Sequence, residues 1–282
     1  MQDILILPEI ATLDISACSG CTLNDGLLCV VADDRHDLYV FDLNGERQHT
    51  IALFSEPLPE DELERKKVKA DLEALCQLTD QQLLAIGSGS RKNRCRGALI
   101  DALSWTSKEV DLSSLYLEVE ERVGELNIEG GAVVRDTLFL GQRGNSSTGV
   151  NALIQLDVSM VLQELESAAL SGKSLRSIIP LQLGAIEGVP FSLTDLAPSH
   201  DGNLWFTGAA EDTEDPYLDG EIKGTIIGKM NTDGVILWQR LVSPLVKLEG
   251  VCEGPSNCLY LVSDADDPEV MSPLFQLDIR KL

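Results

Sequence analysis

Carboxylates stand at the start of several short apolar runs in this sequence. The segment "NIEGG" places Glu129 just ahead of the run "AVV", and "KLEGV" places Glu249 in a similar setting. The segment "DLEAL" does nearly the same with Glu73. Carboxylates gathered in one place can bind a calcium or magnesium ion, and a single carboxylate can act as a general base. Binding of a cation requires a fold that brings these distant residues together.

The same carboxylates mark a repeat. Aligned on them, the chain divides into five segments, each with an apolar run, a polar turn and a second apolar run, the pattern of a β-hairpin. A third apolar run follows in every segment and a fourth in most of them. Repeats of this length with four strands each are typical of β-propeller blades. The segments start 54, 56, 66 and 54 residues apart, at Ser19, Glu73, Glu129, Asp195 and Glu249.

We therefore predict an all-β fold, a five-bladed β-propeller of four-stranded antiparallel blades. The fifth segment lacks a fourth strand because the chain ends at Leu282, and the N-terminal run "DILILPEI" can supply that strand. It would close the ring and cover an exposed sheet edge. This interpretation makes residues 1–282 a single domain. A six-bladed propeller and a β-sandwich are the alternatives, although a sandwich does not require segments of near-equal length.

The sequence also predicts the secondary structure of three segments between the hairpins. The run "SLYLEVEE" at 114–121 is expected to be the outer strand of the second blade. The run "MVLQELESAALSG" at 160–172 has the apolar spacing of a short helix and ends in glycine. The charged run "EDELERKKVKAD" at 60–71 is expected to be a helix or a mobile loop.

Propeller geometry predicts where the recurring carboxylates lie. In a four-stranded meander, the first strand begins and the second strand ends on the same face of the disc. The carboxylates should therefore surround the mouth of the central channel. Their oxygen atoms favour calcium or magnesium, and only three histidines in the chain make zinc a poor fit. The predicted metal ligands are Glu73, Glu129, Asp195, Glu249 and Asp264.

The recurring carboxylates also have a purely structural interpretation. A carboxylate at the start of a strand can accept hydrogen bonds from backbone amides of the neighbouring blade and so fix the blades without any ligand. The sequence leaves both interpretations open.

Basic residues occur on loops of the same predicted face. The segment "SGSRKNR" contains Arg91, "GQRGN" contains Arg143 and Asn145, and Lys69 shortly precedes the second repeat. Arginine can hold a phosphate or carboxylate group through two parallel hydrogen bonds. We predict that Lys69, Arg91, Arg143 and Asn145 bind a small anionic ligand. Ion pairs between these residues and the acidic ring are the alternative.

The charge balance excludes several classes of partner. The chain has 46 acidic and 22 basic residues and a net charge of −24, which repels nucleic acid and anionic membranes. No apolar run approaches the roughly 18 residues of a membrane span. The N-terminal "MQDILILPEI" does not resemble a signal peptide. Most of the seven cysteines lie in or beside apolar runs, so we expect a cytoplasmic protein with reduced thiols.

With "DLEAL", "NIEGG", "KLEGV" and "SDADD", the chain resembles the phytase-like and esterase-like β-propeller proteins, and within them an uncharacterised bacterial branch. The resemblance implies a calcium cofactor at the channel mouth and hydrolysis of phosphate esters. We therefore predict a metal-dependent hydrolase of a small anionic ester, in which Glu129 and Glu249 are the catalytic carboxylates and water is activated by the metal. The alternative is a non-catalytic propeller that binds a ligand or a protein.

Overall fold

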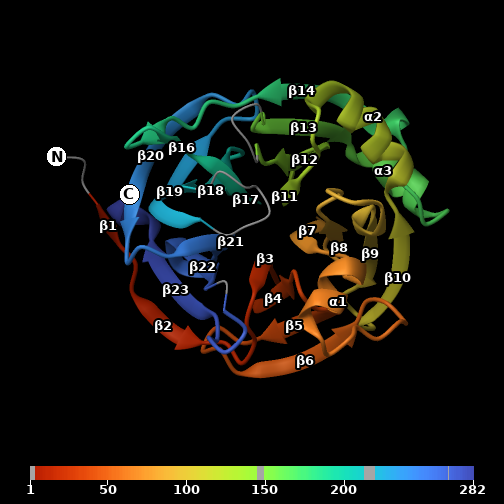
Figure 1. Cartoon of the computed structure of the whole chain (residues 1–282), viewed down its shortest axis with the longest axis horizontal. Coiled ribbons are helices and arrows are strands. Elements are labelled where there is room, and N and C mark those ends of the chain that lie inside the picture. Colours follow the sequence, from red (N-terminus) through yellow and green to blue (C-terminus); the bar gives the residue numbers. More distant parts are fainter. Residues whose placement is uncertain (1–3, 145–148, 213–219, 266) are drawn as a thin grey trace.

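Five β-sheets stand around a central axis in this computed structural model, which describes residues 4–144, 149–212, 220–265 and 267–282 (Figure 1). Each sheet contains four antiparallel strands, and the fourth sheet carries one additional short strand. The prediction of a five-bladed β-propeller is therefore confirmed. The first strand of each blade lies nearest the axis (Figure 1).

In blades 1 to 4 the four strands follow one another in chain order, whereas the outer strand of blade 5 comes from the N-terminal end of the chain. Blade 1 contains β3 (Cys18–Asn24), β4 (Leu27–Ala32), β5 (Asp37–Phe41) and β6 (Arg47–Ala52). Blade 2 contains β7 (Leu72–Thr79), β8 (Gln82–Gly87), β9 (Arg96–Asp101) and β10 (Thr106–Asp111). Blade 3 contains β11 (Ile128–Val134), β12 (Thr137–Gln142), β13 (Ala152–Asp157) and β14 (Leu175–Pro180). Blade 4 contains β17 (Ser192–Pro198), β18 (Leu204–Asp212), β19 (Glu221–Met230) and β20 (Ile236–Ser243). Blade 5 contains β21 (Lys247–Gly254), β22 (Cys258–Asp264), β23 (Pro273–Asp278) and β2 (Glu9–Thr12).

The N-terminal segment closes the ring across two blades. Strand β2 pairs antiparallel with β23 and completes blade 5, which confirms the predicted closure. The preceding strand, β1 (Leu5–Ile6), pairs in parallel with β20 at the edge of blade 4, a contact that the sequence did not predict. Leu5 and Leu7 are buried, whereas Ile4 and Ile6 are 56% and 67% exposed. Side chains therefore alternate between a buried and an exposed face along this segment, which bridges blades 4 and 5.

Three helices lie outside the blades. The predicted helix at 160–172 is confirmed as α3 (Val158–Leu165). Of the two alternatives for 60–71, a helix or a mobile loop, the structure contains the helix, α1 (Glu62–Val68). The prediction for "SLYLEVEE" is wrong, because this run lies in α2 (Ser113–Val123) and β10 is the outer strand of blade 2. Leu115, Tyr116 and Val119 are the buried residues of α2, and their spacing is that of a helix face. Strand β10 buries only Val110, so its apolar signal is weak.

Shorter elements connect the blades. They are the hairpin of β15 (Ala185–Ile186) and β16 (Val189–Pro190) and the 3-10 helices η1 (Lys92–Arg94), η2 (Gly172–Ser174), η3 (Pro255–Asn257) and η4 (Ile279–Lys281).

The inner strands of neighbouring blades approach each other closely. A Cβ atom added to Gly130 would lie 2.5 Å from the backbone nitrogen of Leu196 in the next blade. A Cβ atom on Gly20 would lie 3.1 Å from the carbonyl oxygen of Glu73. This close approach explains why glycine follows the recurring carboxylate in "NIEGG" and "KLEGV".

All seven cysteines are free thiols, and five of them, Cys18, Cys21, Cys29, Cys76 and Cys252, are buried. Among the described residues, no helix combines the length and apolar composition needed to cross a membrane.

Candidate functional site

A β-bulge lies near the start of every inner strand. In each blade the ladder between the first and second strands shifts register by one residue of the inner strand. Bulges of this kind redirect a side chain, and they occur often near binding sites. We call the five inner-strand residues at these register shifts the ring positions. They are Ser19, Glu73, Glu129, Thr194 and Glu249.

The fourth ring position corrects the sequence alignment by one residue. Thr194 occupies it, and its hydroxyl group donates a hydrogen bond to the carbonyl oxygen of Leu248 at 2.6 Å in the next blade. Ser19 likewise donates to the carbonyl oxygen of Leu72. These two ring positions therefore connect neighbouring blades through hydroxyl groups.

Asp195 does not lie where a metal ligand was predicted. It is one residue beyond the ring position, and its carboxylate accepts a hydrogen bond at 2.7 Å from the backbone N–H of Val251 in the next blade. Asp195 is not among the described residues that line the cavity at the channel mouth. Burial raises the pKa of this carboxyl group well above its usual range. For Asp195 the structure supports the structural interpretation, because the one-residue shift directs the side chain toward the neighbouring blade.

A cavity of about 310 Å³ opens at the channel mouth. Its described lining contains no aromatic side chain and consists mainly of charged residues. Such a cavity suits a small, polar ligand. The lining includes Asp33, Lys69, Asp71, Glu73, Arg91, Arg94, Asn127, Glu129, Arg143, Lys247, Glu249 and Asp264.

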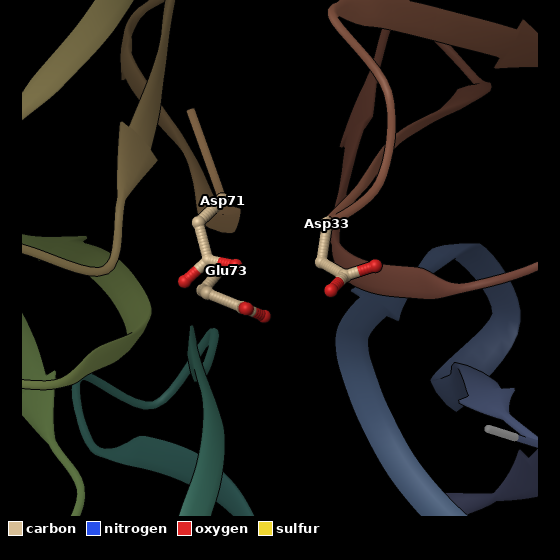
Figure 2. A group of neighbouring side chains, drawn as sticks. All are labelled: Asp33, Asp71 and Glu73. Atoms are coloured by element: carbon tan, nitrogen blue, oxygen red, sulfur yellow. The ribbon is translucent and has the colours of Figure 1, made fainter. Parts of the chain in front are cut away.

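Three carboxylates converge on one side of this cavity. Asp33 follows β4 in blade 1, while Asp71 and Glu73 lie at the start of β7 in blade 2. One ligand oxygen from each lies within 4.8 Å of the others, and the carboxylates of Asp33 and Glu73 point toward each other (Figure 2). This separation allows the three oxygens to share one cation. We call these three residues the acidic cluster.

Lys69 already supplies a positive charge to the acidic cluster. Its ammonium group contacts the carboxylate of Asp33 and lies 2.8 Å from that of Asp71. Burial opposes the charged form of Lys69, but Asp33, Asp71 and Glu73 outweigh it and raise the pKa of the amine above its usual range. Lys69 is therefore a charged, buried partner of the cluster.

Asp71 and Glu73 differ in the number of their other contacts. Asp71 has a positive φ of 56° and is held at 2.6 Å by both Arg94 and the hydroxyl group of Ser88. No hydrogen bond or ion pair reaches Glu73 from the described residues. Burial and repulsion by Glu129 raise the pKa of Glu73 well above its usual range. Glu73 is thus the carboxylate with the least compensated charge.

Basic residues compensate the remaining two ring glutamates. Lys247 lies 2.9 Å from Glu249, and Arg143 lies 3.5 Å from Glu129 and 2.9 Å from Glu211. The amide group of Asn127 also donates to Glu129. Burial nevertheless raises the pKa of Glu129 to about 8, because it outweighs the opposing charges of Arg143 and Lys247. Glu129 can therefore gain or lose a proton near neutral pH.

The structure brings most of the predicted site residues to this cavity. Glu73, Glu129, Glu249 and Asp264 line it, and so do Lys69, Arg91 and Arg143. Of the predicted metal ligands, only Glu73 belongs to the acidic cluster found among the described residues. Asn145, predicted to bind the anion, lies outside the described residues.

Sequence reasoning overlooked Asp71, Asn127 and Lys247 as site residues. Each stands two residues before a ring glutamate, in "DLE", "NIE" and "KLE". Residues two apart on a strand share a face, so this spacing was a usable signal. The approach of Asp33 to Asp71 has no such signal, because it depends on the packing of blade 1 against blade 2.

The raised pKa of Glu129 predicts a pH-dependent stability. Between the reference pKa of 4.5 and about 8, the folded protein keeps a proton on Glu129 that the unfolded chain has lost. The free energy of unfolding should therefore fall as the pH rises through this window, by at most about 1.4 kcal/mol per pH unit. Glu129→Gln should flatten this dependence and make the protein more stable than wild type at pH 8. Urea denaturation at pH 6 and pH 8 measures both effects.

The exposed substitution Glu121→Gln on α2 is the matched control, and it should leave the pH dependence unchanged. An unchanged slope in Glu129→Gln would show that Glu129 is ionised throughout this range.

The fold and the charged channel mouth define a β-propeller with a candidate small-molecule site. The chain belongs to a family of unknown function, DUF6929, whose model matches residues 14–279. A search of curated protein sequences found no match.

Solved structures with the same kind of fold have varied functions. Glutaminyl cyclase from Myxococcus xanthus superposes with a TM-score of 0.55 at 9% identity, covering 98% of this chain and 100% of that chain. A glycosyl hydrolase from Bacteroides ovatus gives a TM-score of 0.53 at 9% identity, covering 95% and 86%. The calcium-binding protein regucalcin from Agrobacterium tumefaciens gives a TM-score of 0.51 at 13% identity, covering 98% of this chain and 95% of that chain. At these identities the likeness concerns the fold alone.

Proposed function

We propose that the protein hydrolyses a small anionic ester at the channel mouth with the help of a divalent cation. The observation that carries this proposal is the acidic cluster, in which ligand oxygens of Asp33, Asp71 and Glu73 lie within 4.8 Å of one another. Each carboxylate offers two oxygen atoms, and such a donor set suits calcium or magnesium. Calcium is the preferred ion, because it tolerates irregular coordination better than magnesium does. Regucalcin indicates that a propeller of related shape can belong to a calcium-binding protein.

The charge around the cluster supports a cation. Lys69 neutralises part of the negative charge, but burial and repulsion by Glu129 raise the pKa of Glu73. Additional positive charge nearby strongly stabilises the ionised form of such a carboxyl group. A cation held there would polarise the ester and lower the pKa of a bound water.

Glu129 is the residue that we assign to proton transfer. Its pKa of about 8 allows it to accept a proton from an attacking water and return that proton to the leaving oxygen. Glu249, the other predicted catalytic carboxylate, is paired with Lys247 at 2.9 Å. We assign Glu249 to orienting Lys247 at the cavity wall.

The basic residues of the lining indicate the chemistry of the substrate. Arg91 and Arg143 lie on the same cavity as the acidic cluster and can orient an anionic group. The cavity of about 310 Å³ limits the ligand to a small molecule. The choice of a phosphate ester rests on the resemblance of four short motifs to phytase-like propellers, since the family match carries no function.

A second function is favoured by one specific contact. The ammonium group of Lys69 already bridges Asp33 and Asp71, so the cluster has an internal counter-charge. A propeller that binds a small polar ligand without a metal and without catalysis fits this contact.

The test is an assay of purified protein on small phosphate monoesters, with calcium, magnesium or a chelator present. We expect hydrolysis that requires one of the two ions, stops with the chelator and returns when the ion is restored. Calcium binding without hydrolysis of any ester would favour the non-catalytic function. Hydrolysis that persists in chelator would contradict the role of the cation.

A further inference from the structure

The segment that carries Lys69 is held to the propeller by few contacts. It leaves the core after Phe54 and returns at Ala70, and no residue of 55–68 is buried. Helix α1 lies within this segment, over the junction of blades 1 and 2 (Figure 1). Its apolar residues Leu63 and Val68 are 69% and 47% exposed, so burial of apolar surface contributes little to holding it.

Polar contacts hold the segment instead. Arg65 lies 3.6 Å from Asp34, and the amide group of Asn93 donates to the carbonyl oxygen of Lys69 at 2.8 Å. The side chain of Lys69, which is 7% exposed, contacts Asp33 and Asp71 in the acidic cluster. The other ion pairs of α1, Lys66 with Glu62 and Lys67 with Glu64, lie within the helix itself. Before α1, Glu56 is also attached, through an ion pair with Arg96 and a contact between its carbonyl oxygen and Nδ1 of His36. Lys69 is therefore the buried attachment at the C-terminal end of α1.

Lys69 and a bound cation require the same carboxylate groups. The ammonium group contacts two of the three carboxylates that would coordinate the ion. Two positive charges at one cluster repel each other, and a cation that coordinates Asp33 and Asp71 replaces their contacts with Lys69. Occupancy of the cluster by one therefore weakens the binding of the other.

We propose that Lys69 is a built-in competitor for the cation and that α1 is a strap released when a divalent cation displaces it. This inference rests on the proposed function, because it assigns a regulatory contact to the same acidic cluster. The apparent affinity for the cation is then reduced by the fraction of molecules in which Lys69 occupies the cluster. Cation binding opens the channel mouth on the side of blades 1 and 2.

Lys69→Met tests the competition, and Lys69→Arg is the matched control that keeps a competing positive charge. Calcium binding is measured by isothermal titration calorimetry for both variants and wild type. If Lys69 occupies the cluster in nine molecules out of ten, Lys69→Met should bind calcium about tenfold more tightly, and Lys69→Arg should stay close to wild type. Calcium binding to wild type with no gain in Lys69→Met would overturn the inference and leave the proposed function standing.

Trypsin reports the release of α1, because Arg65, Lys66 and Lys67 provide cleavage sites in the helix. Calcium should accelerate cleavage of wild type at these sites, as identified by mass spectrometry of the fragments. Lys69→Met should be cleaved rapidly with or without calcium. If calcium leaves the rate of cleavage in wild-type α1 unchanged or lowers it, the proposed release of α1 is overturned.

Arg65→Gln provides a second route if Lys69→Met does not fold. It loosens α1 without altering the acidic cluster and should raise both calcium affinity and cleavage after Lys66 and Lys67. Unchanged affinity and cleavage in Arg65→Gln would overturn the inference. Absence of calcium binding in wild type and in all variants would contradict the proposed function, and the competition with it.

Discussion

Deletion of residues 1–10 is expected to lower the melting temperature by about 10 °C or more and to reduce the yield of folded protein. The deletion removes buried Leu5 and Leu7, each of which contributes about 1.5–3 kcal/mol through burial of its side chain. It also removes β1 and exposes the outer edge of β20 in blade 4. Strand β2 loses its first residues, so blade 5 is weakened as well. Thermal denaturation followed by circular dichroism measures the loss.

The alternation of the N-terminal segment offers a matched pair of variants. Leu5→Ser with Leu7→Ser should reproduce much of the loss, because both side chains are buried. Ile4→Ser with Ile6→Ser changes the same number of apolar residues on the exposed face and should melt close to wild type. A truncated protein that melts like wild type would show that the N-terminal strands do not close the ring.

Glu73→Gln is expected to reduce metal-dependent hydrolysis about 100-fold or more. The substitution keeps the size of the side chain but replaces one carboxyl group of the acidic cluster with an amide. Mutation of residues that merely support metal ligands typically costs 10–100-fold, so loss of a proposed ligand should cost at least as much. Asp71→Asn should have a similar effect on activity, with an additional loss of stability because Arg94 and Lys69 lose a charged partner. Rates measured at saturating calcium and saturating substrate separate a loss of binding from a loss of turnover.

Glu121→Gln on α2 is the control, since it removes a charge from an exposed helix of a protein with a net charge of −24. It should keep full activity. Equal rates in Glu73→Gln and wild type would remove Glu73 from the proposed site.

The propeller was predictable because its signal is repeated. Five segments of near-equal length, each with a hairpin pattern, required a closed arrangement, and the strand missing at the C-terminal end matched the spare run at the N-terminal end. The parallel pairing of β1 with β20 was not predictable, because two residues carry too little pattern to select a partner strand. Helix α2 was mistaken for a strand because Leu115, Tyr116 and Leu117 form a continuous apolar run, which fits either structure at this length.

The site was predictable in place but not in detail. Symmetry brings Glu73, Glu129 and Glu249 to one cavity, as expected from their recurrence. The alignment failed at Asp195, because the sequence does not reveal which residue of "LTDL" forms the bulge. The acidic cluster combines the end of β4 with the start of β7, two positions that are not equivalent in the repeat. Contacts of this kind arise from the packing of unlike blades, which repeat analysis does not capture.

Calorimetric titration of calcium into wild type and Glu73→Gln tests the proposed cation site most directly. The account predicts one binding site per chain in wild type, loss of that site in Glu73→Gln, and its retention in Glu121→Gln. Excess negative charge elsewhere on the surface would bind calcium weakly and equally in all three proteins. Absence of binding in wild type, or equal binding in wild type and Glu73→Gln, would contradict a cation at the acidic cluster.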